Sequence, residues 1–283
     1  MKVHILIPVH NRLIETKKCI ASLLNQTYSN IEIYIIDDGS SDGTKEWVDK
    51  INATRIEGNG NLWWTGAIAK GVNYVLPLSK ENDFIMTLNN DVVLDKNAIN
   101  SLVLSSKKEN NAIFGSLAID NKTNFCMSSG AITKSWILNI NFHPYREKMS
   151  SEVDNSLTEV SMLTGRSVLY PISVIKSVGN FDSKWLPHYG GDIEMTVRIK
   201  NAGYLLFIDP KSKVYVNREE TGLNPGERYL SFSERLSSLF SIKSANSLYY
   251  RTILAIKIVP FYSIPSYIFI TYLKIFFSLF FKK

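Results

Sequence analysis

One short segment carries acidic and amide side chains that have the chemistry to hold a divalent cation. The segment NND, at residues 89–91, interrupts an apolar run that spans residues 84–95. Mg²⁺ prefers oxygen ligands, takes one or two carboxylates and keeps several of its waters. We therefore expect Asp91, assisted by the amide oxygen of Asn89, to bind Mg²⁺ or Mn²⁺. Standing alone, the same segment would be an Asx turn that ends a strand.

A diphosphate group would suit such a cation. Negative charge builds on a diphosphate when it departs as a leaving group, and a bridging divalent cation stabilises that charge. Asn90 lies within the same segment and is expected to contact this ligand. Arg166 stands in a polar turn of LTGRSVLYP, at residues 163–171, and is expected to contact the diphosphate or an acidic acceptor. A surface position is the alternative for Arg166.

Asp192 is the candidate for a general base. It follows Gly190 and Gly191 and falls in the first turn of an expected helix, where the helix dipole favours an acid. From there it would take a proton from an acceptor hydroxyl. An acid that only begins a helix is the alternative. Arg198 follows Glu194 by four residues, a spacing at which the two side chains pair on a helix.

Two glycine-containing segments are expected to bind the rest of the ligand. Asp38, in DDGSSDGT at residues 37–44, would accept hydrogen bonds from a nucleobase imide or a ribose hydroxyl; a turn in which Asp42 caps the next helix is the alternative. The loop of GNGNLWWTGAIAKG, at residues 58–71, precedes a helix and would bring backbone N–H groups and Gly66 to phosphate. Trp63 and Trp64 would stack on a sugar or base, although one of them is expected in the core.

The elements that must position these residues alternate along the first 120 residues. Strands are expected at residues 3–7, 31–36, 54–57, 84–88 and 112–119, and helices at residues 15–25, 44–51, 65–76 and 96–107; a further helix is expected at residues 192–201. This alternation predicts an α/β fold with a mostly parallel central sheet flanked by helices. The polar segments follow strands, so they should meet at the carboxyl edge of the sheet, where ligands bind.

Composition narrows the class of protein. The net charge of +6 favours anionic partners, but the basic residues are dispersed and form no nucleic-acid-binding motif, so no nucleic acid is expected. The two cysteines, Cys19 and Cys126, form no metal or disulfide pattern, which indicates a reducing compartment. The N-terminal MKVHILIPVHNR is interpreted as a first strand and not as a signal peptide.

The composition changes after residue 226. Residues 227–283 are expected to form an apolar, helical region whose longest charge-free piece, residues 258–273, is short for a membrane span. We expect its helices to lie in a membrane interface, with the basic side chains facing anionic headgroups. These are Lys243, Arg251, Lys257, Lys274, Lys282 and Lys283. A helical hairpin packed on the catalytic domain or on a second subunit is the alternative, and a homodimer stays open.

Five segments, taken in order, resemble the family 2 glycosyltransferases, which have the GT-A fold. They are PVHNR (residues 8–12), SLLNQTY (22–28), IIDDGSSDGT (35–44), NNDVVLD (89–95), and GNFD (179–182) followed by the block at 192–198. The resemblance covers roughly residues 1–226. It implies a nucleotide-sugar-binding half at residues 1–120, an acceptor-binding half at 121–226, and an inverting transfer in which an acceptor hydroxyl attacks the anomeric carbon.

The resemblance also implies roles for single residues. Pro8 and His10 would border the nucleobase that Asp38 binds, Asp91 would be the metal-ligating aspartate of the DxD motif, and Asp192 the catalytic base. Further donor contacts are expected from Arg12, Gly66, Asn90 and Arg166, and acceptor or sugar contacts from Trp64, His188, Gly191 and Arg198. The sequence departs from the family at Asn89, Gly191 and Ala69, which replace an acid, an acid and an asparagine.

The function expected from this resemblance is extension of a lipid-linked or nascent bacterial surface polysaccharide, such as capsule or O-antigen, at the cytoplasmic face of the inner membrane. The segments WWTGA, TGR and HYGGD are similar to segments of rhamnosyltransferases, so dTDP-rhamnose and UDP-sugars are the candidate donors. The alternative is a non-catalytic sugar-nucleotide-binding module of a membrane glycan-assembly complex. A nucleotidyltransferase is disfavoured because PVHNRLIETK lacks a glycine-rich loop.

Overall fold

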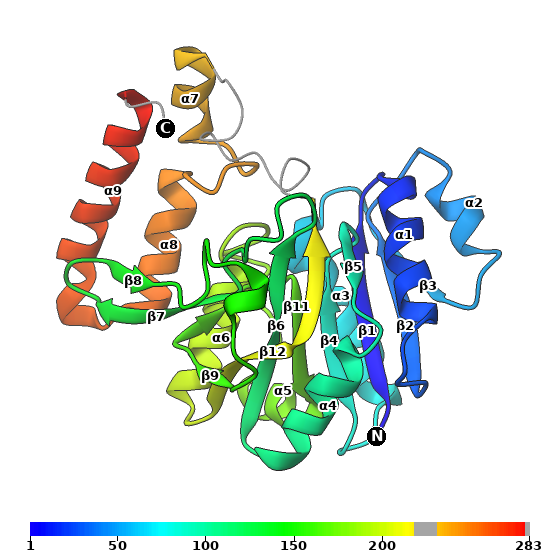
Figure 1. The fold of residues 1–283 in the computed structure, drawn as a ribbon. Helices are drawn as coiled ribbons and strands as arrows, with labels where there is room; N and C mark the ends of the chain where they lie inside the picture. Colours follow the sequence, from blue (N-terminus) through cyan, green and yellow to red (C-terminus); the bar gives the residue numbers. More distant parts are fainter. Residues whose placement is uncertain (218–230, 281–283) are drawn as a thin grey trace.

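The computed structural model describes residues 1–217 and 231–280, which form a mixed α/β structure around a central sheet (Figure 1). Within these residues, nine strands make up that sheet. Eight of them run in the order β3-β2-β1-β4-β11-β6-β12-β5, and β9 pairs with β12. The strands are β1 (Val3–Val9), β2 (Ile31–Asp37), β3 (Thr54–Glu57), β4 (Phe84–Leu88), β5 (Val92–Leu94), β6 (Ala112–Asp120), β9 (Thr158–Glu159), β11 (Ser167–Pro171) and β12 (Leu205–Val216).

Most strands of the sheet point the same way, as the sequence predicts. The pairs β1–β2, β2–β3, β1–β4 and β6–β12 are parallel, while β11 is antiparallel to both β4 and β6. The strands β5 and β9 are antiparallel to β12. All five predicted strands are present, and the α/β prediction with a mostly parallel sheet is confirmed.

Helices cover both faces of the sheet, which explains why the strands are apolar without alternation. Successive side chains of a strand point to opposite faces. In β1, Leu6 belongs to one buried cluster, whereas Ile5 and Ile7 belong to the other. The first cluster is completed by α3 (Trp63–Val75), α5 (Ile172–Val178) and α6 (Gly191–Asn201), and the second by α1 (Leu13–Leu24), α2 (Thr44–Val48) and α4 (Ala98–Lys108).

The parallel register brings the polar segments to one edge. Val9 lies beside Asp37 at the ends of β1 and β2, and Leu6 lies beside Thr87 in β4. The three segments that follow these strands therefore leave the sheet at its carboxyl edge. This is the arrangement that the strand–loop–helix pattern predicts.

A second layer stands beside the sheet, at the left of Figure 1. It contains a three-stranded sheet of β10 (Met162–Leu163), β7 (Gly130–Ser135) and β8 (Ile140–Phe142), and the helices α7 (Phe232–Ser238), α8 (Leu248–Ile258) and α9 (Ile264–Phe280). Leu254 and Ala255 of α8 share a buried cluster with Val197 of α6. The C-terminal helices thus form a hairpin that packs on the α/β domain. The predicted boundary at residue 226 lies outside the described residues.

The basic side chains of this C-terminal region make protein contacts that the sequence did not predict. Lys257 forms an ion pair of 2.5 Å with Asp182, and the Nε of Arg251 donates to a backbone carbonyl at 2.6 Å. Lys243 stands 5.8 Å from the centre of the Trp63 ring. Each of these three side chains thus has a contact within the protein, and the expectation that they face lipid headgroups stays a prediction.

Three basic positions remain in the C-terminal region. Lys274 donates to the carbonyl oxygen of Asn139 from an exposed site. Lys282 and Lys283 lie outside the described residues.

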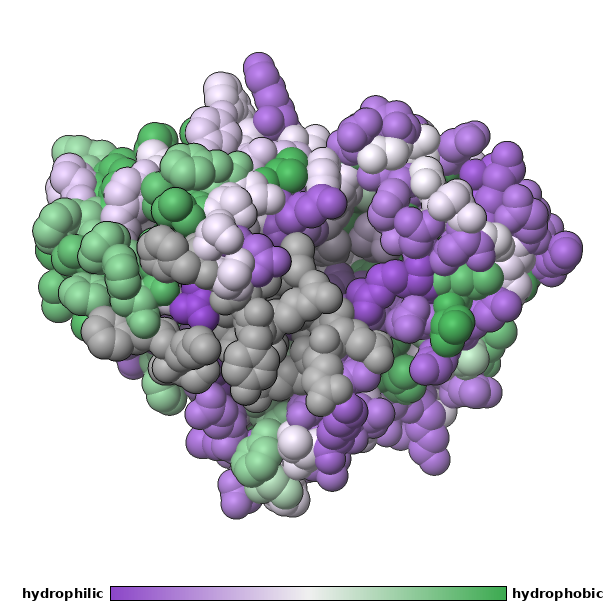
Figure 2. All heavy atoms as spheres, turned by 90° about the horizontal axis from the view of Figure 1, so that it is seen from above, coloured by the Kyte–Doolittle hydropathy of each residue, from purple (hydrophilic) through white to green (hydrophobic). Residues whose placement is uncertain are grey.

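The outer face of α9 remains apolar and exposed. Phe269, Phe276 and Phe277 are each more than half exposed. Figure 2 shows apolar side chains gathered at the left, on the side where Figure 1 places α8 and α9. Within residues 1–217 and 231–280, one helical stretch, Phe261–Phe280, is long and apolar enough by length and composition to cross a membrane.

Candidate active site

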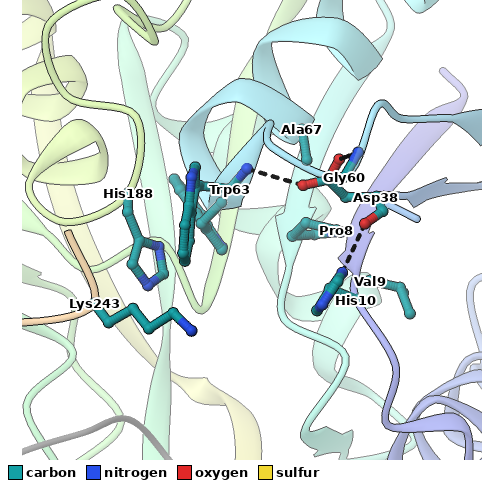
Figure 3. A pocket seen from close by; sticks show the side chains of 10 residues that line it. Pro8, Val9, His10, Asp38, Gly60, Trp63, Ala67, His188 and Lys243 are labelled. Atoms are coloured by element: carbon teal, nitrogen blue, oxygen red, sulfur yellow. Dashed lines mark hydrogen bonds between the residues drawn. The ribbon is translucent and has the colours of Figure 1, made fainter. Parts of the chain in front are cut away.

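A cavity of about 320 Å³ opens between the end of β1 and the start of α3 (Figure 3). Five residues predicted for the site line it: Pro8, His10, Asp38, Trp64 and His188. Trp63, predicted to stack on a ligand, lines it too. The sequence reasoning missed four further lining residues: Val9, Gly60, Ala67 and Lys243. Ala67 follows Trp63 by one helical turn, so the spacing could have revealed it, whereas Lys243 carries no local signal.

The Asp38 carboxylate organises the loop that forms one wall of the cavity. Its Oδ1 accepts from the backbone N–H of Gly60 at 2.8 Å, and its Oδ2 accepts from those of Leu62 at 2.8 Å and Trp63 at 3.1 Å. Its carbonyl oxygen lies 2.6 Å from Nδ1 of His10. Three N–H groups thus compensate the carboxylate charge at the start of α3. The predicted contact of Asp38 with a nucleobase stays a prediction.

Trp63 is held in a conformation that a tryptophan rarely adopts. Its φ of 57° is in the left-handed region, which costs energy for a residue other than glycine. The bond to Asp38 holds its backbone, and His188 lies 5.3 Å from its ring centre. Such local strain is concentrated at functional sites. The strain places an aromatic face on the cavity wall, which supports the predicted stacking role.

His188 forms an uncharged part of the cavity wall. Burial lowers its pKa to about 4, so the ring is uncharged near pH 7. Its Nδ1 is buried and has no protein partner in the described part of the chain. The cavity therefore offers one unused ring nitrogen for a ligand, in keeping with the predicted sugar or acceptor contact.

Trp64 connects the cavity to the NND segment and to the neighbour of Asp192. Its indole N–H donates to Oδ1 of Asn89 at 2.8 Å. Its ring covers Gly165 so closely that a Cβ at Gly165 would lie 2.4 Å from it. The N–H of Gly165 in turn donates to Oδ2 of Asp192 at 2.8 Å. One side chain thus touches the cavity, the NND segment and the neighbour of the candidate base.

Asp91 has one oxygen satisfied and one free for a ligand. Its Oδ2 lies 3.3 Å from Nη1 of Arg12, while its Oδ1 is buried and has no hydrogen-bond partner among the described residues. Arg12 and Asn11 both adopt positive φ angles, of 66° and 59°, which turn the chain back at this point. A buried carboxylate oxygen without a partner is costly, so it indicates a ligand position.

The donor set fits a divalent cation only in part. No group of three His, Cys, Asp or Glu side chains suited to a metal occurs within residues 1–217 and 231–280. Asp91 offers a buried carboxylate oxygen without a partner, whereas the Asn89 oxygen predicted as a second ligand already accepts from Trp64. A Mg²⁺ or Mn²⁺ ion would take Asp91 and complete its shell with ligand phosphates and water, which such ions tolerate.

The Asn90 side chain is bonded to helix α1. Its side chain is buried, and its Nδ2 donates to Oγ1 of Thr16 on α1 at 3.0 Å. The amide thus has a partner on α1, and the expected contact of Asn90 with the donor stays a prediction.

Asp192 is half-buried at the start of α6 and has the environment of a base. Burial raises the pKa of its carboxyl above the ordinary range, while the N–H groups of Gly165 and Ile193 and the charge of Arg166 act in the opposite direction. A raised pKa makes the carboxylate a stronger proton acceptor at neutral pH. Arg166 lies between the two acidic positions, because its carbonyl oxygen also accepts from the N–H of Asn89.

Gly191 is required by a close contact and not by freedom of its backbone. A Cβ at this position would lie 2.2 Å from Oγ1 of Thr65, the buried third residue of α3. That hydroxyl donates to the carbonyl oxygen of His188 at 3.1 Å. The acid that the family places before the base has no room here, because Thr65 occupies the space.

Two predicted site residues have structural positions instead. Arg198 forms the predicted pair with Glu194, at 2.8 Å from Nε to Oε1, and also donates to the carbonyl oxygens of Val178 and Asn180 at 2.5 and 2.9 Å. Gly66 is buried near Ser183 and does not line the cavity. Both residues join α3 and α6 to neighbouring segments, and the expected contacts of Arg198 with an acceptor and of Gly66 with the donor stay predictions.

Comparison with known proteins places these features in a wider group. Residues 4–175 match the sequence profile of the family described as "Glycosyl transferase family 2". "Glycosyltransferase GlyG" of Streptococcus pneumoniae is 29% identical over 104 residues, which cover 35% of this chain and 33% of that protein. An uncharacterized glycosyltransferase of Rickettsia typhi is 26% identical over 241 residues, covering 80% of this chain and 69% of that protein. The chain thus spans about a third of the first relative and about two thirds of the second.

Solved structures share the fold at low sequence identity. The crystal structure of GalNAc-T7 with UDP, GalNAc and Mn²⁺ aligns with a TM-score of 0.61 and 15% identity, covering 92% of this chain and 52% of that one. The structure of S. aureus TarS aligns with a TM-score of 0.55 and 16% identity, covering 90% and 42%. These likenesses support the GT-A fold.

Proposed function

The chain belongs to glycosyl transferase family 2, and from this premise we propose that it is an inverting glycosyltransferase that moves a sugar from a nucleoside-diphosphate sugar to a hydroxyl group of a glycan. One observation carries the proposal. The Trp64 side chain lines the cavity, bonds to the NND segment and covers the glycine that holds Asp192. The cavity, the segment that contains Asp91 and the neighbour of the candidate base are thereby joined around a single ring.

The residues of the chain divide the chemistry between them. Asp192 would accept the proton of the acceptor hydroxyl, whose oxygen forms a bond to the anomeric carbon as the bond from that carbon to the phosphate oxygen breaks. The nucleoside diphosphate leaves with the electron pair of that bond. Asp91 would hold a divalent cation, which when bound stabilises the negative charge on the departing diphosphate. The aromatic walls made by Trp63, Trp64 and His188 would exclude water from the sugar.

The donor and acceptor are proposed from chemistry and from relatives. A dTDP- or UDP-linked sugar suits the cavity, with dTDP-rhamnose and UDP-sugars as candidates. The structural relative GalNAc-T7 was crystallised with UDP, GalNAc and Mn²⁺, which supports a UDP-sugar and a divalent cation. For the acceptor we propose a lipid-linked or nascent bacterial surface glycan, because the exposed apolar face of α9 would keep the enzyme beside such a lipid.

The central test is donor turnover. Purified protein incubated with dTDP-rhamnose and a panel of UDP-sugars, with Mn²⁺, should release nucleoside diphosphate from one of them, and faster with a glycan acceptor. Asp192→Asn should lower this transfer at least about a thousandfold and leave nucleotide binding unchanged. Full turnover by the variant would show that Asp192 is not the base. Nucleotide binding without turnover in the wild-type protein would favour the non-catalytic module.

The membrane location needs its own test. We propose that α9 holds the protein at the cytoplasmic face of the inner membrane through its exposed phenylalanines. Phe269→Ser/Phe276→Ser/Phe277→Ser should release the protein from vesicles that contain anionic lipid. The matched control is Leu24→Ser/Leu104→Ser, which changes exposed leucines on α1 and α4. If the α9 variant floats with vesicles as well as the wild type does, the proposed attachment is wrong.

A further inference from the structure

Lys243 brings a cation into the cavity from outside the part of the chain that matches the family. The match ends at residue 175, whereas Lys243 lies in the segment between α7 and α8. Its side chain lines the cavity, with Nζ 5.8 Å from the centre of the Trp63 ring. Figure 3 shows it extended past His188 toward the space bordered by Trp63 and the end of β1.

The other groups of the cavity leave this positive charge uncompensated. Asp38 is the other charged residue of the lining, and its carboxylate is engaged by three backbone N–H groups. His188 is neutral near pH 7 because burial lowers its pKa to about 4. Within residues 1–217 and 231–280, Lys243 forms no ion pair with a carboxylate. Among the described residues, the lining therefore presents one ammonium group that forms no ion pair, which suits an anionic ligand.

The lysine is held in place by a packed segment. The N–H of Leu248 donates to the carbonyl oxygen of Leu239 at 2.8 Å, and Arg251 donates through Nε to that of Ala245 at 2.6 Å. The first bond joins the two ends of the segment that contains Lys243, and the second lies on its C-terminal side. The helix α8 that follows rests on α6, where Leu254 lies close to Gly190. The ammonium group is thus carried by a fixed part of the fold and not by a free end.

The NND segment explains why an ammonium group is needed in the cavity. It supplies one unpaired carboxylate oxygen, from Asp91, and an amide in place of the family's first acid. A divalent cation bound to the NND segment has few protein ligands, so part of the diphosphate charge is left for another group to balance. Resting on the proposed function, we propose that Lys243 binds the diphosphate of the nucleotide donor and makes the C-terminal region a part of the donor site.

The test compares a nucleotide with its nucleoside. Binding of UDP and uridine, and of dTDP and thymidine, is measured by calorimetry in EDTA, so that no divalent cation substitutes for the ammonium. Lys243→Gln should weaken the nucleoside diphosphate that the wild type binds about tenfold or more and leave its nucleoside unchanged, since the charged contact is lost. Lys243→Arg should retain most of the affinity.

The chain offers a matched control. Lys17 stands 5.7 Å from the centre of the Trp47 ring, a similar contact outside the cavity, so Lys17→Gln should change neither affinity. If Lys243→Gln weakens nucleoside and diphosphate equally, the lysine only supports Trp63 and the inference is wrong. It is also wrong if diphosphate binding is unchanged. Binding by the wild type only when Mn²⁺ replaces EDTA would also overturn the inference, and failure to bind any of the four ligands even with Mn²⁺ would overturn the proposed function with it.

Discussion

The indole N–H of Trp64 donates a 2.8 Å hydrogen bond to the side-chain oxygen of Asn89, so the residue that departs from the family's acidic motif has a defined partner. An aspartate at this position would keep the indole as its donor. It would also place a second negative charge close to Asp91. Asn89 therefore lowers the negative charge of the site without changing its geometry. A single substitution, Asn89→Asp, separates the effect of the charge from that of the geometry.

Asn89→Asp should tighten the dependence on divalent cations. We expect the Mn²⁺ concentration for half-maximal activity to fall about tenfold, since a second carboxylate adds attraction for the cation. The rate as a function of Mn²⁺ concentration measures this. Asn97→Asp, which adds the same charge at an exposed position, should change nothing. An unchanged cation dependence in Asn89→Asp would show that residue 89 does not face the cation.

The pH dependence of kcat should have an acid limb set by Asp192. The base must be ionised, and burial raises its pKa, so activity should fall as the pH decreases through a value above the ordinary carboxylate pKa of about 3.9. Arg166→Gln removes a charge that lowers the pKa of Asp192 and should move the limb to higher pH. A limb that Arg166→Gln leaves in place would contradict the assignment.

Gly191→Ala should destabilise the protein by about 1–3 kcal/mol, because its Cβ overlaps the Thr65 side chain. Thr65→Ala removes the two atoms that make the closest contacts. The double variant Gly191→Ala/Thr65→Ala should therefore be less destabilised than the sum of the single variants. Urea denaturation of all four proteins gives the coupling free energy. Simple additivity would show that the contact is not the reason for the glycine.

Arg198→Met should affect stability and not donor binding. It leaves Glu194, whose side chain is 7% exposed, without its partner and breaks the bonds to the carbonyl oxygens of Val178 and Asn180. We expect a loss of about 2–4 kcal/mol in the free energy of unfolding, with the donor KM of the folded protein unchanged. The double variant Arg198→Met/Glu194→Gln should recover part of the loss. A raised KM for the acceptor or the donor would show that Arg198 also contacts a substrate.

Stability should decline in mild acid because of His188. Its pKa is about 4 in the folded protein and about 6.5 in an unfolded chain, so its contribution to folding is complete above pH 6.5. That contribution is lost as the pH falls from 6.5 toward 4, at no more than about 1.4 kcal/mol per pH unit. Thermal unfolding across this range should decline less steeply in His188→Gln. Equal slopes in the two proteins would contradict the burial of a neutral ring.

The sheet and its polar edge could be predicted because the signals are local. β1, β2 and β4 are buried on both faces, which leaves continuous apolar runs, and each run ends in a polar segment at the same edge. Asp192 could be placed because a helix start is marked by the glycines before it. These inferences need no knowledge of which segments meet across the fold.

The remaining positions depend on contacts between distant segments. Lys243 reaches the cavity only because α8 packs on α6, and no sequence pattern near residue 243 indicates that it lines the cavity. Arg198 has the predicted i,i+4 partner, yet its bonds to Val178 and Asn180 fix its role, and these come from another element. The direction of the Asn90 side chain depends on the local path of the chain after β4, which the sequence pattern does not specify.

The packing of Leu254 against Gly190 has a practical consequence for how the protein is assayed. Leu254 belongs to α8, the neighbour of the apolar α9, and Gly190 stands two residues before Asp192. A detergent that binds α9, or a truncation that removes it, also disturbs α8, which packs beside the glycine that precedes the base. Rates measured in micelles, on vesicles and with shortened chains should therefore be treated as properties of three different preparations.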